Sequence, residues 1–209
     1  MIKLDRYVPF SYYRLTVLRD AGLILSSYLL NIHKTASNLS ALPSLKKTLS
    51  QKDLNILELG AGCGIVGIAL STTLRNPQIL LTDLPEAVEI LTHNLALLTS
   101  SRPTHQVLDW SEPLSPNVQS TKWDVVVVAD CTYNPDVVPD LVATLGRVAE
   151  GNQDSLVLLA MKVRHESEMV FFELMDQGCW VVHEKALIPL PVLGGEDEEI
   201  EIYVFKRKS

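Results

Sequence analysis

Hydrophobic runs and helical repeats alternate along the chain from about residue 54 onward. Short apolar runs predict strands, and segments with apolar side chains every three or four residues predict helices between them. The expected strands are Asn55–Leu59, Gln78–Thr82, Thr104–Leu108, Asp124–Ala129 and Ser155–Met161. The expected helices are Ile65–Leu74, Pro85–Thr99, Pro135–Ala149 and His165–Gln177, and a polar, proline-containing loop is expected over Ser111–Lys122. Strands that alternate with helices indicate a mostly parallel sheet covered by helices on both faces.

The C-terminal part of the pattern departs from this alternation. Trp180–Ala186 and Ile200–Phe205 also read as strands, but no helical segment separates them. We expect them to pair as an antiparallel hairpin at one edge of the sheet. The predicted fold class is therefore α/β, a Rossmann-like seven-stranded mostly parallel sheet with an antiparallel C-terminal hairpin. The hairpin loop carries the acidic run Glu196–Glu199, which is either a solvated loop or a lip that attracts a basic substrate.

The first 50 residues are less regular than the rest. Ala21–Ile32 is apolar but contains serines and an asparagine, and it is shorter than the ~18–20 residues that span a bilayer. We expect it to be a core helix, followed by a loop at Lys34–Ser44. Residues 1–50 are predicted to form a helical N-terminal extension or lid, and residues 51–209 the main domain.

Composition and charge narrow the choice of partners. Hydrophobic residues make up 47% of the 209-residue chain, as in ordinary globular proteins. The formal net charge of −7 weighs against binding a nucleic acid and suits a basic partner. The cysteines Cys63, Cys131 and Cys179 are scattered and form no disulfide or zinc pattern. We expect a reduced, intracellular monomer, cytoplasmic or nuclear, without a bound metal and away from membranes.

The strongest chemical signal is the segment ELGAGCGIVG, from Glu58 to Gly67, which follows a strand and begins a helix. Glycines there allow a tight turn and a close approach of a ligand to the backbone. Gly62, Gly64 and Gly67 fit the dinucleotide form GxGxxG, whereas Gly60, Gly62 and Gly64 fit the GxGxG form of methyltransferases. Asp83 does not separate the two, because an acid after the second strand binds ribose hydroxyls in both.

The ends of the other strands favour the methyltransferase form. Glu58 could anchor the glycine loop or face a ligand's ammonium group, although it could also simply cap a helix. Asp109 could accept a hydrogen bond from an adenine amino group, and the Trp110 indole could cover the ring or belong to the core. Asp130 and Tyr133 follow the fourth strand. All of these positions should meet at one edge of the sheet, where open α/β folds bind ligands.

These residues carry a family resemblance. The motifs ILELGAGCGIVGIAL, LLTDLP, VLDW and VVVVADCTYNPDVVPDLVATL, within residues 50–206, are similar to those of the methyltransferase-like 21 group of seven-β-strand protein-lysine methyltransferases. That group includes the valosin-containing-protein and elongation-factor lysine methyltransferases. The resemblance implies an S-adenosylmethionine-dependent N-methyltransferase that modifies lysines of a non-histone protein.

The resemblance also implies roles for individual residues. Cofactor contacts are expected from Glu58, Gly60, Ala61, Gly62, Cys63, Gly64, Asp83, Leu84, Asp109, Trp110 and Ala129. Asp130 and Tyr133 would be catalytic and line the channel for the lysine. The family usually has a tryptophan before the N-terminal helix, and Arg19 stands in its place here, so the resemblance does not extend to the cofactor's N-terminal lid.

Lysine methylation needs the neutral amine, which the site must favour by desolvation and alignment because the ordinary pKa of lysine is ~10.4. Asp130 could hold the arriving ammonium form, and Tyr133 could orient the amine. Arg164 or His165 either contacts the substrate or lies in a solvated loop. The alternatives are a small-molecule N-methyltransferase, a catalytically impaired interaction protein and an NAD-dependent oxidoreductase.

Overall fold

A seven-stranded sheet with the order β3-β2-β1-β4-β5-β7-β6 forms the centre of the computed structural model. The structure describes residues 12–32, 42–99, 103–162, 169–189 and 199–208, with residues 12–20 described by their backbone alone. The parallel strands are β1 (Asn55–Leu59), β2 (Gln78–Asp83), β3 (Thr104–Val107), β4 (Val125–Ala129) and β5 (Leu156–Met161). The expected Rossmann-like fold is confirmed.

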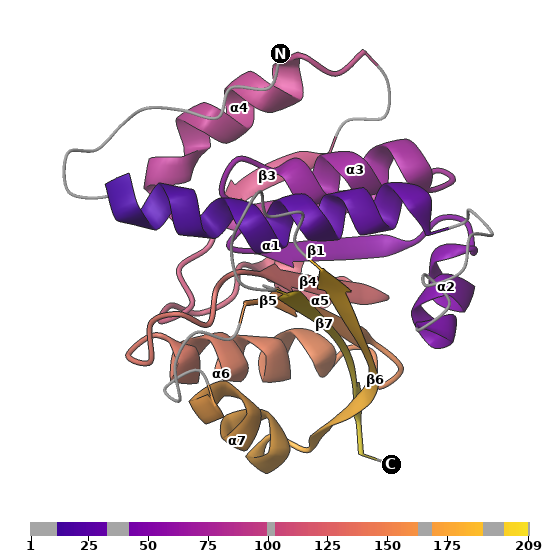
Figure 1. Cartoon of the computed structure of the whole chain (residues 1–209), viewed down its shortest axis with the longest axis vertical. Helices are drawn as coiled ribbons and strands as arrows, with labels where there is room; N and C mark the ends of the chain where they lie inside the picture. Colours follow the sequence, from indigo (N-terminus) through magenta and orange to yellow (C-terminus); the bar gives the residue numbers. More distant parts are fainter. Residues whose placement is uncertain (1–11, 33–41, 100–102, 163–168, 190–198, 209) are drawn as a thin grey trace.

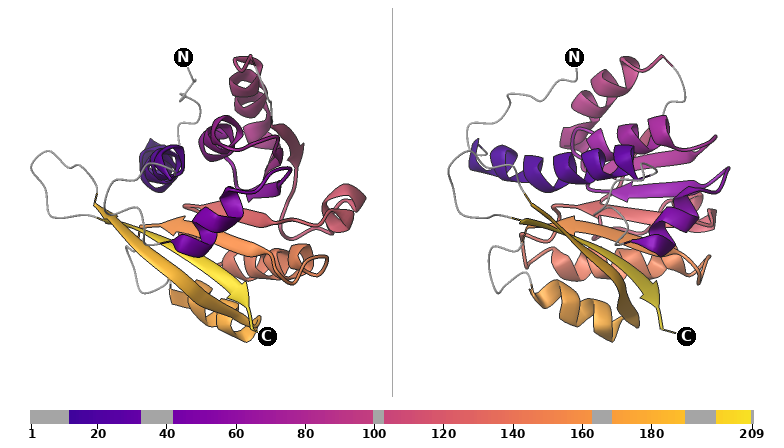
Figure 2. Two further views of the ribbon diagram at one scale, coloured as in Figure 1. Left: turned by 90° about the vertical axis from the view of Figure 1, so that its right-hand side faces the viewer. Right: turned by 45° about the vertical axis from the view of Figure 1, so that its right-hand side comes forward.

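The helices form two layers, one on each face of the sheet (Figures 1 and 2). The first layer contains α1 (Tyr12–Asn31), α2 (Pro43–Leu49), α3 (Ile65–Thr73) and α4 (Val88–Ala96). The second contains α5 (Pro116–Ser120), α6 (Val138–Ala149) and α7 (Met169–Gln177). The central strands β4 and β5 are apolar throughout because they are covered on both faces.

The C-terminal hairpin consists of β6 (Trp180–Pro189) and β7 (Glu199–Arg207), and both of its pairings are antiparallel. The prediction of an antiparallel hairpin at one edge is confirmed. β7 pairs with β5 and lies inside the sheet, whereas β6 forms the edge. Met161 at the end of β5 is opposite Glu201, so the first residues of β7 lie at the edge of the sheet where the parallel strands end.

Five local predictions need correction. The N-terminal helix begins at Tyr12 instead of Ala21, and α6 begins at Val138 instead of Pro135. Lys34–Ser44 was expected to be a loop, but Pro43 and Ser44 begin α2. The expected loop at 111–122 contains the short helix α5, which begins with the Ser115 hydroxyl accepting a hydrogen bond from the Val118 amide. The helix expected over Pro85–Thr99 begins instead as a 3-10 turn, Pro85–Ala87, and α4 ends at Ala96.

The helix α1 packs closely on the start of α3. A Cβ at Gly22 would lie 3.7 Å from the Ile65 side chain and 3.9 Å from that of Val66. Ten residues of α1 precede Gly22, and at ~1.5 Å per residue they extend about 15 Å. This part of α1 projects beyond the start of α3, past the edge where the parallel strands end (Figure 1).

None of the described helices combines the length and apolarity that crossing a membrane requires.

Candidate functional site

The glycine loop between β1 and α3 has a backbone that only glycine adopts without strain. Gly60, Gly62 and Gly64 have φ values of 68°, 56° and 79°, in the left-handed region. The loop is tied to its surroundings by the Ala61 amide, which donates to the Thr82 carbonyl at 3.0 Å. A Cβ on Gly62 would have no atom within 4 Å. The middle of the loop therefore faces open space.

Glu58 lies beneath this loop and is only 2% exposed. Its carboxyl accepts a hydrogen bond of 2.8 Å from the Gly67 amide in the first turn of α3. The pKa of Glu58 is raised from its ordinary 4.5 to about 8, chiefly by burial and also by the nearby Asp83 carboxylate, and the hydrogen bond from Gly67 opposes this increase. Glu58 thus anchors the glycine loop through the helix that follows it.

Asp83 ends β2 next to the middle of the loop. Its Oδ2 accepts a hydrogen bond of 2.6 Å from the Gly62 amide, and its Oδ1 accepts one of 2.7 Å from the Leu84 amide. Burial raises the pKa of Asp83, and the two hydrogen bonds oppose that increase. The Leu84 side chain is exposed next to it. The Asp83 carboxylate therefore lies beside the open space in front of Gly62.

Asp109 and Trp110 follow β3 and border the loop on another side. Asp109 is exposed, and its Oδ1 accepts hydrogen bonds from the side chain and the amide of Ser111, which lower the pKa of the Asp109 carboxyl. The Trp110 ring lies against the glycine loop, because a Cβ on Gly60 would be 3.3 Å from its Cζ2 atom. Trp110 also packs on the core, and a cover over an adenine ring stays a prediction for its indole.

The end of β4 completes this edge of the sheet. Asp130 is 3% exposed, and its φ of 57° turns the chain sharply as it leaves Ala129. The buried Cys131 packs under the loop, and a Cβ on Gly60 would be 2.5 Å from its sulfur. Tyr133 is 38% exposed, at the rim of the same edge.

Carboxylates gather around the point where β1, β2 and β4 end. Burial raises the pKa of the Cys131 thiol, and the negative charges of Asp83, Asp130 and Glu58 raise it further. Within the described ranges, no group of three or more His, Cys, Asp or Glu side chains has an arrangement that could hold a metal ion. The raised pKa keeps the Cys131 thiol neutral, and the carboxylates around it suit a polar or cationic ligand.

Several residues that the sequence did not point to hold the backbone of the site by hydrogen bonds. Asn94 on α4 is fully buried and donates a hydrogen bond of 2.9 Å to the Cys63 carbonyl in the glycine loop. Thr144 and Arg147 on α6 donate to the Trp110 carbonyl. The sequence offered no signal for these contacts, because each joins segments that are far apart along the chain.

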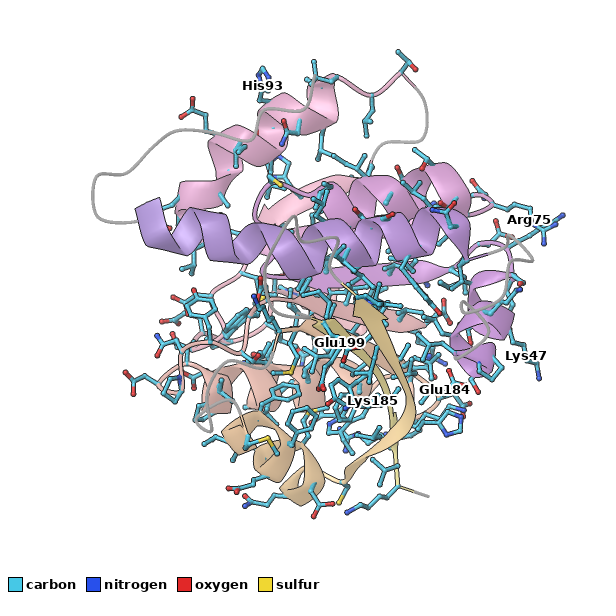
Figure 3. All side chains as sticks on the ribbon, in the orientation of Figure 1. Lys47, Arg75, His93, Glu184, Lys185 and Glu199 are labelled. Carbon is cyan, nitrogen blue, oxygen red and sulfur yellow. The ribbon has the colours of Figure 1, made fainter. Side chains whose placement is uncertain are left out.

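Other predictions fall outside the described residues or at their margin. Arg164 and His165 lie outside them, as does most of the acidic run, of which only Glu199 is described. Glu199 begins β7, and Lys185 lies on the neighbouring strand β6 (Figure 3). Lys185 forms an ion pair of 3.0 Å with Glu201. The side chain of Arg19 is likewise outside the described part. The cofactor and catalytic roles of the site residues stay predictions.

A protein-family model described as lysine methyltransferase matches residues 16–178 of this chain. EEF1A lysine methyltransferase 3 of Xenopus tropicalis is 33% identical over 163 residues, which cover 78% of this chain and 68% of that protein. Protein N-lysine methyltransferase METTL21A of Mus musculus is 31% identical over 128 residues, covering 58% of this chain and 55% of the mouse protein. The chain spans about half the length of the first curated relatives it matches.

The fold has counterparts among solved structures. One is magnesium protoporphyrin IX methyltransferase from Synechocystis with bound SAM, with a TM-score of 0.60 and 13% sequence identity. The match covers 98% of this chain and 86% of the other. At this level of identity the likeness concerns the fold alone.

Proposed function

Since the chain belongs to the lysine methyltransferase family, we propose that it transfers the methyl group of S-adenosylmethionine to lysine side chains of a protein other than a histone. The observation that carries this proposal is the arrangement at one sheet edge. The open glycine loop lies between Asp83 and Trp110, and Asp130 and Tyr133 follow the neighbouring strand.

The residues around the loop fit the parts of S-adenosylmethionine. Asp83 would bind the ribose hydroxyls, Trp110 would cover the adenine, and Gly60 and Gly62 leave the backbone open to the methionine portion. The site's carboxylates favour the positive charge of the sulfonium. When bound, this cofactor supplies a methyl group that is already activated for transfer, so the protein needs no strong base.

The protein's own part is to receive, neutralise and orient the lysine. Asp130 attracts the ammonium form, and Tyr133 at the rim contacts the side chain and aligns its nitrogen. Burial favours loss of the ammonium proton to water, because a desolvated site disfavours the charged form. The neutral nitrogen would then be aligned by Tyr133 to receive the methyl group that the cofactor supplies.

The charge distribution supports a basic substrate. Glu199 begins β7 at the edge of the sheet that Asp130, the residue after β4, also reaches, and Glu201 beside it is paired with Lys185. Lys47 and Arg75 lie on the other side of the molecule, near the start of the parallel strands (Figure 3). The carboxylates of Asp130 and Glu199 at this edge would attract a lysine-bearing segment with further positive charges.

Isothermal titration with S-adenosylmethionine, with NADH as the control ligand, tests the cofactor. We expect binding of the first alone. No binding of either would refute the proposal and favour a protein that only interacts with partners. Binding of NADH alone would indicate an oxidoreductase.

A radioactive methyl donor added to cell lysate with the purified protein tests the acceptor. Labelled protein bands whose label is recovered as methyl-lysine support the proposal. Label confined to small molecules would indicate a small-molecule N-methyltransferase instead.

A further inference from the structure

The segment that carries Trp110 is irregular, and its position depends on contacts with other elements. It lies between β3 and α5, where the chain has no ladder of backbone hydrogen bonds. Asp109 closes a local turn by accepting from the amide of Ser111. This turn shapes the segment but does not attach it to the rest of the protein.

The Leu108 amide attaches the start of the segment to β2 by donating to the Asp83 carbonyl at 2.9 Å, and the attachment at Trp110 itself comes from α6. The Trp110 carbonyl accepts two hydrogen bonds, one of 3.2 Å from the Thr144 hydroxyl and one of 2.9 Å from Nη2 of Arg147. The same Nη2 donates to the Thr144 hydroxyl at 2.7 Å. Thr144 is fully buried, and residues three apart on a helix share one face. The three groups therefore form a closed triangle beneath the tryptophan.

Arg147 extends this triangle to a second point on the segment. Its other terminal nitrogen, Nη1, donates a hydrogen bond of 3.1 Å to the Glu112 carbonyl. A guanidinium group is planar and holds its donors at fixed directions, so two carbonyls bound to it are fixed relative to each other. A lysine ammonium would keep the charge but would not reproduce this geometry.

The indole of Trp110 is thereby directed at the glycine loop, close to the position that a Cβ on Gly60 would occupy. We propose that Thr144 and Arg147 are positioning residues, which hold the Trp110 indole against the glycine loop and so set the cofactor's adenine subsite. This inference rests on the proposed function, because it assigns Trp110 to the adenine of S-adenosylmethionine.

The chain offers a matched control in Arg207. This arginine also donates to a backbone carbonyl of α6, that of Gly146 at 3.0 Å, and its guanidinium lies 4.9 Å from the centre of the Trp180 ring. Trp180 belongs to β6, away from the glycine loop. Arg207→Lys therefore makes a similar change at a similar arginine without touching the site.

Titration calorimetry with S-adenosylhomocysteine tests the proposal in the whole protein. Losing a hydrogen bond from a charged donor is typically worth about tenfold in affinity. We expect Arg147→Lys and Thr144→Val to weaken binding by about this factor and Arg207→Lys to leave it unchanged. In a Trp110→Ala background, Arg147→Lys should cause no further loss. Equal losses with and without Trp110 would overturn the proposal, because they would show that Arg147 acts independently of the indole.

Fluorescence quenching by acrylamide tests the positioning without any ligand. The other two tryptophans, Trp123 and Trp180, are 3% and 2% exposed, so quenching reports mainly on Trp110. Arg147→Lys should increase quenching, and the increase should vanish in Trp110→Phe. An unchanged quenching curve would overturn the proposal even if the protein binds S-adenosylhomocysteine. Increased quenching in a protein that binds no cofactor would support the positioning role and refute the proposed function.

Discussion

The Glu58 carboxyl accepts a hydrogen bond of 2.8 Å from the Gly67 amide, and this contact joins the end of β1 to the first turn of α3. It requires glycine at position 67, because a Cβ there would lie 2.8 Å from Oε2 of Glu58 and 2.2 Å from the Leu81 side chain. The glycine at this position, which made the dinucleotide motif plausible in the sequence, therefore serves close packing of α3 on the sheet.

This contact makes stability depend on pH. The pKa of Glu58 is about 8 in the folded protein against an ordinary 4.5, so between these values the folded state holds a proton that the unfolded chain has released. The free energy of unfolding attributable to Glu58 should therefore fall as the pH rises from about 4.5 to 8.

Glu58→Gln tests this dependence, because glutamine resembles the protonated acid and still accepts from Gly67. We expect urea denaturation to show the wild type and the variant equally stable near pH 5 and the variant more stable above pH 8. Glu173→Gln, at an exposed position of α7, is the control. A constant difference across this range would contradict the prediction.

Two alanine substitutions in the glycine loop should separate folding from ligand binding. Both Gly60→Ala and Gly62→Ala place a Cβ at positive φ, which costs about 1–2 kcal/mol. Only Gly60→Ala also meets the Cys131 sulfur, so it should lower the melting temperature more. Gly62→Ala should weaken S-adenosylmethionine binding at least about tenfold, because its methyl group would occupy the open space before the loop. The reverse order of stabilities would show that Cys131 moves aside.

The charge of Asp130 should matter for transfer more than for cofactor binding. Asparagine tolerates the left-handed backbone found here, so Asp130→Asn removes the charge without straining the turn. We expect methyl transfer to fall about 100-fold while the Kd for S-adenosylmethionine stays within a few-fold. Asp124→Asn, just before the opposite end of β4, is the control because its carboxylate accepts a hydrogen bond from the Asn55 amide, away from the site. Unchanged turnover would remove Asp130 from the mechanism.

The short helix α2 should depend on a residue of β6. The Glu184 carboxylate accepts hydrogen bonds from the amides of Ser44, at 2.6 Å, and Leu45, at 3.3 Å, and so caps the helix from across the fold. Glu184→Ala should lower the free energy of unfolding by about 1 kcal/mol. Urea denaturation against wild type measures this, with Glu150→Ala, at the end of α6, as the comparison. An equal effect of both substitutions would mean that general charge, rather than capping, is responsible.

The strands and the site edge were predictable because their causes are local. Asp124–Ala129 is almost entirely β-branched, which indicated a buried strand, and parallel strands necessarily end at one edge. That rule predicts that Asp83 and Asp130 lie close together. The structure agrees, because the negative charges of both raise the pKa of the Cys131 thiol.

The features that escaped prediction depend on tertiary contacts. The helix α2 has seven residues and is capped by a side chain about 140 positions further along. The support of Trp110 by Arg147 is of the same kind, because nothing near Arg147 in the sequence distinguishes it from a solvated helical arginine. The helix α5 is different, because Ser115 followed by proline is a helix-start signal that we interpreted as part of a loop.

The position of β7 has a consequence for assembly during synthesis. Because β7 separates β5 from β6, the edge strand β6 leaves the ribosome before the only strand that it pairs with in the described sheet. Until β7 follows, β6 has no partner, and its apolar face with Trp180 stays exposed to other nascent chains and chaperones. The parallel half of the sheet can form early, but closure of the molecule has to wait for β7.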